Sequence, residues 1–187
     1  MKTRAYFIST TISTILQCLY ILVVTLIGSL LLPNLLQSIT IDPSSGPPAG
    51  FSNFMWVSTA ISGIGFVLAP IVYVGSGALY AWLHRREAQP VTAEQGAVGG
   101  AAVAATARFT TGLFQALTSL LVTGLLYQNI ASQIGPIPGG IPGGTPFIIG
   151  FGIFSGVMGS ILGTCFGSVF AAALGALGGS LTGALLK

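Results

Sequence analysis

The sequence predicts an all-α integral membrane protein with four transmembrane helices that pack as a glycine zipper. Its 187 residues are 52% hydrophobic and only 5% charged, whereas about a quarter of a soluble domain is charged. Four apolar segments reach or approach the roughly 20 residues that cross a bilayer as a helix. Small residues recur every fourth position near the C-terminus, as close helix packing in lipid requires. We therefore expect a single membrane domain over residues 1–187.

The first apolar segment covers residues 6–32 and follows the basic residues Lys2 and Arg4. A basic start followed by an apolar stretch resembles a secretory signal peptide, but this stretch is too long for a signal core. No cleavage site with small residues follows it. We therefore predict an uncleaved signal anchor that remains as the first span.

The second apolar segment covers residues 54–83 and carries both tryptophans. Trp56 and Trp82 lie 26 positions apart, which is about 39 Å of helix. This length matches a bilayer with its two interfaces, where Trp side chains prefer to lie. We expect the following interface anchors: Trp56, Trp82, Arg85 and Arg86, together with Arg108 at the membrane edge.

The third apolar segment, residues 109–127, is predicted to belong to a longer helix. Thr92 and Gln95 have the spacing of a helix capping box, in which each residue bonds the backbone of the other. A helix that starts there crosses residues 92–107 before it reaches the apolar segment. We expect these residues to form an extension on the cytoplasmic side.

The fourth segment covers residues 147–170 and is followed by an Ala- and Gly-rich tail at 171–187. One helix over both parts would be about 60 Å long, twice the hydrocarbon thickness. We expect the tail to be a second cytoplasmic extension that packs on 92–107. A separate fifth span is the alternative, but two spans and a turn barely fit into this length.

A row of glycines along the fourth segment predicts close helix packing. Residues four positions apart turn by about 40° around a helix, so one straight partner cannot follow the whole row. We expect its first part to contact one neighbour and its last part another, either within this chain or in a second chain. The predicted packing residues are Gly152, Gly156, Gly159, Gly163, Gly167, Gly175, Gly179 and Gly183.

Charge predicts the orientation, because basic residues favour cytoplasmic loops. With four spans, all six basic residues fall on one side. The opposite loops, near 35–53 and 128–146, contain a single charged residue, Asp42. Both termini are thus expected in the cytoplasm, in a bacterial-type inner or plasma membrane. The Pro-Gly-Gly run at 135–144 is expected to be a neutral turn, with a re-entrant loop as the alternative.

Few side chains offer chemistry. His84 is the only histidine, and we expect an interfacial residue there, with haem or pigment ligation as the alternative. Cys18 and Cys165 are expected to be unpaired packing residues. No catalytic triad, carboxylate pair or phosphate loop can be assembled, so we predict no enzyme. No basic run with aromatic residues indicates nucleic-acid binding.

The sequence is therefore interpreted as a non-catalytic accessory or scaffolding subunit of a larger membrane complex, of which respiratory and photosynthetic assemblies are examples. Its expected partners are other membrane subunits, further copies of itself, and lipids. No cofactor is required by the sequence, and lipid or pigment contacts are compatible with it. The alternative is a small homo-oligomeric channel or facilitator with a glycine-lined helix pair.

Overall fold

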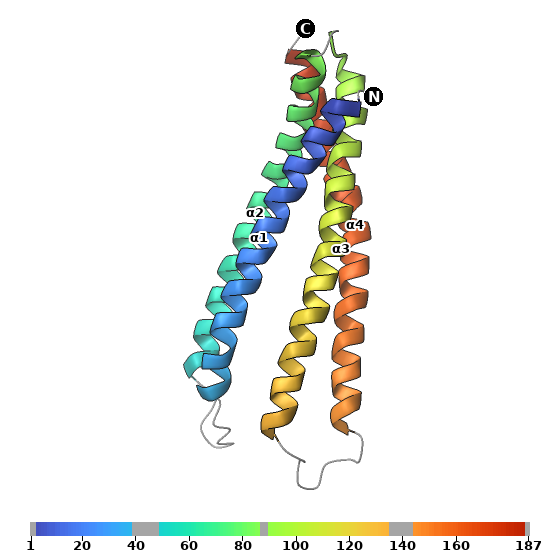
Figure 1. The fold of residues 1–187 in the computed structure, drawn as a ribbon. Helices are drawn as coiled ribbons and strands as arrows, with labels where there is room; N and C mark the ends of the chain where they lie inside the picture. The colour runs from blue at the N-terminus through green and yellow to red at the C-terminus, as the bar shows by residue number, and fades with distance from the viewer. Residues whose placement is uncertain (1–2, 39–48, 87–89, 135–143, 186–187) are drawn as a thin grey trace.

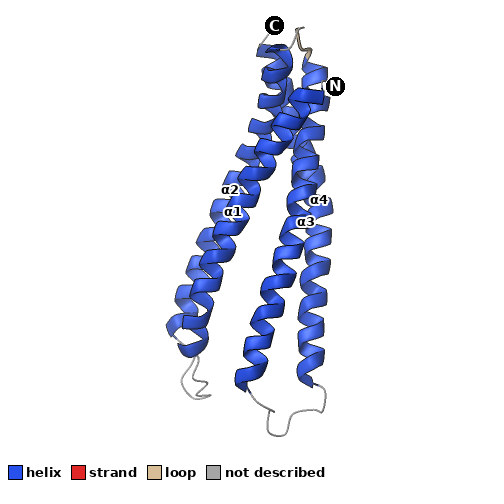
Figure 2. Ribbon diagram, in the orientation of Figure 1, coloured by secondary structure: helices blue, strands red, loops and turns tan. Residues whose placement is uncertain are grey.

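The computed structural model consists of four long helices, and it describes residues 3–38, 49–86, 90–134 and 144–185. The helices are α1 (Thr3–Ser38), α2 (Ala49–Arg86), α3 (Ala93–Ile134) and α4 (Gly144–Leu185). Each covers one of the four predicted apolar segments, and the described residues contain no strand (Figure 2). The all-α prediction is confirmed. Because α4 is a single helix to Leu185, its tail does not form a separate fifth span.

The helices run up and down and form two pairs, α1 with α2 and α3 with α4 (Figure 1). The start of α1, the end of α2, the start of α3 and the end of α4 lie at one end of the bundle, which we call the terminal end. The two pairs are packed together there and diverge toward the opposite end. The largest interface joins α3 and α4, and α2 contacts both of them. The bundle is therefore tight at one end and open at the other.

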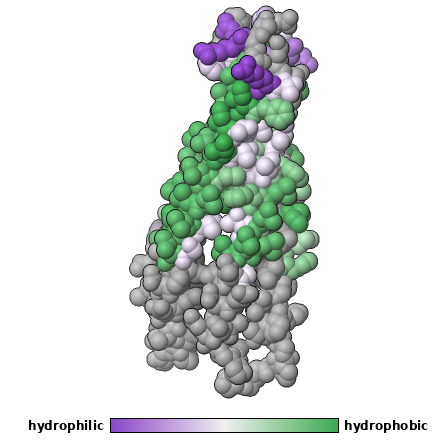
Figure 3. Space-filling model, in the orientation of Figure 1, coloured by the Kyte–Doolittle hydropathy of each residue, from purple (hydrophilic) through white to green (hydrophobic). Residues whose placement is uncertain are grey.

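Three of the helices are long and apolar enough to cross a membrane: α1 over Thr3–Leu30, α2 over Thr59–Arg86 and α4 over Met158–Leu185. The outer surface agrees with this, because large apolar side chains such as Phe166, which is 76% exposed, point outward. The described interior is instead built from small residues and tyrosines, including Ala104, Ala171 and Tyr80. Figure 3 shows hydrophilic residues at the terminal end and a hydrophobic face below them.

Glycine backbones make the closest contacts between α3 and α4. A Cβ atom added to Gly179 would overlap the carbonyl oxygen of Gly96, and one added to Gly175 would overlap that of Gly100. The same holds in the reverse direction for Gly96 and Gly100. The two helix backbones therefore touch directly, with no side chain between them. Such an approach increases van der Waals contact, which drives helix association in lipid.

The second helix, α2, also takes part in the backbone contact between α3 and α4. A Cβ atom on Gly77 would overlap the carbonyl oxygen of Gly175, and one on Gly178 would overlap that of Val74. Residues 93–107 and 171–185 thus lie beside the C-terminal part of α2 and do not project past its end (Figure 1). The location of 92–107 and 171–187 on the cytoplasmic side of the membrane stays a prediction.

The start of α3 is capped as the spacing predicted. The backbone N–H of Gln95 donates to Thr92 Oγ1 at 3.2 Å, and the N–H of Thr92 donates to Gln95 Oε1 at 3.4 Å. These bonds satisfy two backbone donors that a helix start otherwise leaves unpaired. The cap fixes the first residue of α3 and hence the depth of every later residue along it.

We predict opposite effects for two glycine-to-alanine substitutions. Gly179→Ala should destabilise the protein by roughly 1–3 kcal/mol, because its methyl group would overlap backbone that cannot rotate away. Gly75→Ala meets nothing within 4 Å and should be neutral or stabilising by up to about 1 kcal/mol through helix propensity. Thermal unfolding in detergent, followed by circular dichroism, measures both. Equal melting temperatures for the two variants would contradict the contact.

Candidate functional site

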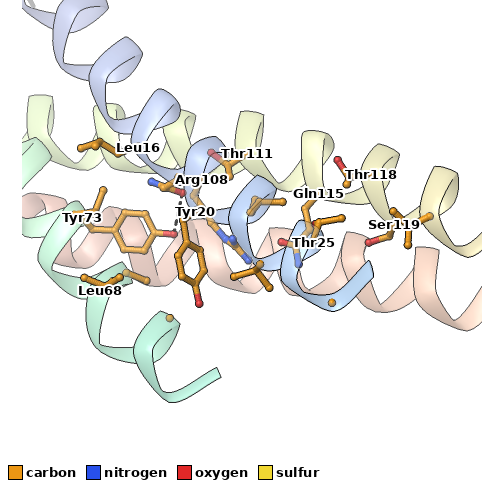
Figure 4. Close-up of a pocket in the computed structure, with 18 of the residues that line it drawn as sticks. Leu16, Tyr20, Thr25, Leu68, Tyr73, Arg108, Thr111, Gln115, Thr118 and Ser119 are labelled. Atoms are coloured by element: carbon orange, nitrogen blue, oxygen red, sulfur yellow. Dashed lines mark hydrogen bonds between the residues drawn. The ribbon is translucent and has the colours of Figure 1, made fainter. Parts of the chain in front are cut away.

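The most distinctive feature is a cavity of about 750 Å³ between α1, α2 and α3, which lies below the tight terminal end and is partly open to the outside. Its α1 wall runs from Leu16 to Ser29, its α2 wall from Gly65 to Tyr73, and its α3 wall from Arg108 to Val122. Figure 4 shows Tyr73, Tyr20 and Arg108 gathered together, with Thr118 and Ser119 farther along α3. The cavity therefore has a polar cluster toward one of its ends.

Arg108 lies deep in the bundle. It follows the first residue of α3 by 15 positions, which is about 22 Å of helix. The side chain is half-buried and lines the cavity. The start of α3 lies near the end of α2 (Figure 1), and Arg108 shares the cavity with Tyr73. Its position at the membrane edge stays a prediction.

A glycine on α4 makes room for this arginine. A Cβ atom on Gly167 would lie 2.7 Å from Arg108 Nε, so a side chain there would require the Arg108 side chain to shift. The α4 backbone thus covers one side of the guanidinium group, while the cavity lies along the walls of the other three helices. Gly167 belongs to the predicted packing row, and the structure places it against a charged side chain.

Two polar side chains accompany Arg108. The Tyr73 hydroxyl, which lines the cavity with Arg108, donates to Gln17 Oε1 at 3.4 Å. The Nε2 atom of Gln17 is buried and has no hydrogen-bond partner. One end of the cavity therefore holds a positive charge and an unsatisfied amide donor, and a buried donor without a partner costs about 1–3 kcal/mol.

The hydroxyl groups along the cavity walls are largely used within their own helices. Thr111 donates to the carbonyl of Ala107 at 2.6 Å, Thr118 to that of Phe114 at 2.9 Å, and Ser29 to that of Leu26 at 2.8 Å. These residues therefore present mainly carbon atoms to the cavity. Apolar residues from all three walls complete its lining: Leu16, Ile21, Val24, Leu68, Val72 and Val122.

Negative charge is scarce near the site. The only acidic side chain in the described ranges is Glu94, which precedes Arg108 by 14 positions on the same helix, or about 21 Å. It lies at the terminal end and cannot reach the guanidinium group. The positive charge of Arg108 is therefore not neutralised by any carboxylate that the structure describes.

The other predicted site residues lie elsewhere. His84 is half-buried near the end of α2, where its Nδ1 lies 3.1 Å from the Tyr80 hydroxyl. The described residues contain no cluster of three His, Cys, Asp or Glu side chains that could hold a metal. Arg86 stacks over the Trp82 ring at 4.0 Å, and Arg85 is exposed beside it. Trp56, toward the opposite end, is 73% exposed.

The predicted glycine row divides into parts with different surroundings. Gly175 and Gly179 touch α3 backbone, and Gly183 faces Thr92 and Ala93. Gly159 and Gly163 meet nothing within 4 Å. Gly152 and Gly156 lie in the part of α4 whose side-chain surroundings are not described. Cys18 and Cys165 are both free thiols, and Cys165 is exposed.

Sequence reasoning missed the association of Arg108 with Tyr73 and Tyr20. Tyr20 lies against Gly65, and its hydroxyl donates to the carbonyl of Ile61 at 2.9 Å. The capping box gives the position of Arg108 along α3, but it does not give the register of α3 against α1 and α2. Gln17 of α1 and Gln115 of α3 line the same cavity.

Comparison with known proteins gives no match: no family model, no curated protein and no solved structure is significantly similar to this chain.

We predict that Tyr73 and Arg108 are energetically coupled. Tyr73→Phe and Arg108→Met should each destabilise the protein, and the double variant should lose less than the sum by about 0.5–3 kcal/mol. Unfolding in detergent measures the four free energies of unfolding. As a matched control, Tyr6→Phe removes a hydrogen bond to Thr106 outside the cavity and should be additive with Arg108→Met. Additivity of Tyr73→Phe with Arg108→Met would contradict an interaction between the two side chains.

Proposed function

We propose that this chain is a non-catalytic accessory subunit of a larger membrane complex, which packs on a neighbouring helix through an open glycine face of α4. The proposal rests on the contrast within the glycine row. Gly175 and Gly179 are covered by other helices of this chain, whereas Gly159 and Gly163 meet nothing within 4 Å. Exposed apolar side chains flank these two glycines, including Leu162, which is 54% exposed.

The physical argument is that small residues matter in lipid only where a second helix comes close. A helix that faces lipid gains nothing from lacking side chains, and glycine inside a helix costs roughly 0.5–1 kcal/mol relative to alanine. Glycines at two positions four apart form a surface on which another helix can approach backbone to backbone. We therefore assign this surface to a transmembrane helix of a neighbouring subunit, and the whole row to glycine-zipper packing.

We further propose four spans with both termini in the cytoplasm of a bacterial-type or plasma membrane. Arg4, Arg85 and Arg86 lie on the helix ends at the terminal end, which supports a cytoplasmic location by the positive-inside rule. The fourth span is α3. It lies beside α4, with which it forms the largest interface, and α4 is itself apolar enough to cross. On this assignment, 93–107 and 171–185 lie level with the cytoplasmic ends of α1 and α2.

A homo-oligomeric channel or facilitator is the second candidate, and three polar side chains in the otherwise apolar cavity favour it. Gln17, Arg108 and Gln115 come from two helices and share one cavity. Such residues can line a path for a polar solute. Flux of a solute into liposomes that contain only the purified chain would support this candidate over a purely structural role.

The accessory role predicts that enlarging the open glycine face breaks assembly and leaves the fold intact. The protein should purify in mild detergent as a complex heavier than the 19.0 kDa chain, and Gly163→Leu should release the free chain. Gly75→Leu is the matched control, because Gly75 also meets nothing within 4 Å but lies on α2. Native mass spectrometry measures the masses, and circular dichroism checks the helix content of each variant.

The masses of the purified complexes distinguish an accessory subunit from a homo-oligomeric channel. Whole multiples of the chain mass indicate a ring of this chain alone, whereas other masses indicate foreign subunits. If Gly163→Leu and Gly75→Leu both assemble like the unaltered protein, the α4 face is not the contact and the proposal fails.

A further inference from the structure

We propose that the cavity between α1, α2 and α3 binds an amphipathic carboxylate, with its head group on Arg108 and its acyl chain along the apolar walls. This site is separate from the open α4 face, because every residue that lines the cavity belongs to the other three helices. The binding proposal and the accessory role therefore stand or fall independently.

The positive charge of Arg108 favours the binding of an anion. A cation removed from water is stabilised only when it is paired and hydrogen-bonded. Glu94, the one acid in the described ranges, lies about 21 Å away along α3. The guanidinium group lines the cavity and carries five N–H donors in a planar fork that fits a carboxylate. A bound anion would supply the missing charge.

The amide of Gln17 adds a second donor. Its Oε1 atom already accepts from Tyr73, whereas its buried Nε2 atom has no partner. Gln17, Tyr73 and Arg108 all line the cavity, and Gln17 bonds the Tyr73 hydroxyl. A carboxylate between them could accept from both, so one head group would satisfy the unused amide and the cation together.

The remainder of the cavity indicates the chemistry of the ligand's tail. The hydroxyls of Thr111, Thr118 and Ser29 bond to carbonyls of their own helices. The walls therefore offer mainly carbon, and the volume of about 750 Å³ is within the usual range for small-molecule sites, about 300–1,000 Å³. A polar head group without a tail would leave this apolar space unfilled.

One positive charge favours a monoanion. A phosphate carries more than one negative charge near neutral pH, and the excess would be buried without a partner at this depth. Phospholipid head groups also lie in the interfacial layer outside the hydrocarbon core, whereas Arg108 lies about 22 Å from the start of α3. A single acyl chain that ends in a carboxylate fits the charge and the depth.

The test measures binding of three probes with the same chain length to the full-length protein, stripped of lipid in detergent. The probes are palmitate, the neutral hexadecanol and hexadecyl phosphate. Palmitate should bind saturably at one site per chain and at least about tenfold more tightly than hexadecanol, as expected for hydrogen bonds to a charged group. Hexadecyl phosphate should bind no more tightly than palmitate.

Two variants locate the charge that is responsible. Arg108→Gln should abolish the preference for palmitate over hexadecanol. Arg86→Gln should preserve it, because Arg86 stacks on Trp82 at the exposed end of α2. If Arg108→Gln does not fold, the comparison of the three probes on the unaltered protein still decides the question. Equal binding of palmitate and hexadecanol, tighter binding of the phosphate, or no saturable binding would each overturn the proposal.

Discussion

Direct backbone contact between helices at the terminal end governs the rest of this structure. Gly96 and Gly100 of α3 meet Gly179 and Gly175 of α4, and Gly77 of α2 reaches the same place. A lipid bilayer provides no hydrophobic force that drives helices together, so close van der Waals packing must do so. Removing side chains at these positions allows that packing, and a single methyl group at Gly179 would prevent it.

The same contact explains how a charge comes to lie inside an apolar bundle. Fixing α3 beside the end of α2 determines the depth of every α3 residue, so Arg108 arrives level with Tyr73. Below the tight end the helix pairs diverge (Figure 1), and the cavity lies between α1, α2 and α3. Gly167 leaves space for the arginine side chain. The register of α3 against α2 and α4 thus produces both the tight packing at one end and the cavity with its polar cluster below it.

Local sequence patterns were sufficient to predict the helices, because hydropathy, capping residues and proline-rich turns act within a few residues of each other. Thr92 and Gln95 located the start of α3, and four-residue spacing identified Gly175 and Gly179 as contact residues. The depth of Arg108 could not be read in this way. It depends on which glycines meet across helices, and several registers of a four-residue repeat satisfy the same pattern.

The most direct test of this register is disulfide formation between Ala93→Cys and Gly183→Cys in a chain without Cys18 and Cys165. A Cβ atom on Gly183 would lie 3.2 Å from the Ala93 Cα atom, and a disulfide requires Cα atoms roughly 4.4–6.8 Å apart. Mild oxidant added to membranes should cross-link this pair within one chain. Ala93→Cys with Gly163→Cys, about 30 Å farther along α4, should remain reduced. Equal cross-linking of both pairs, or of neither, would contradict the account.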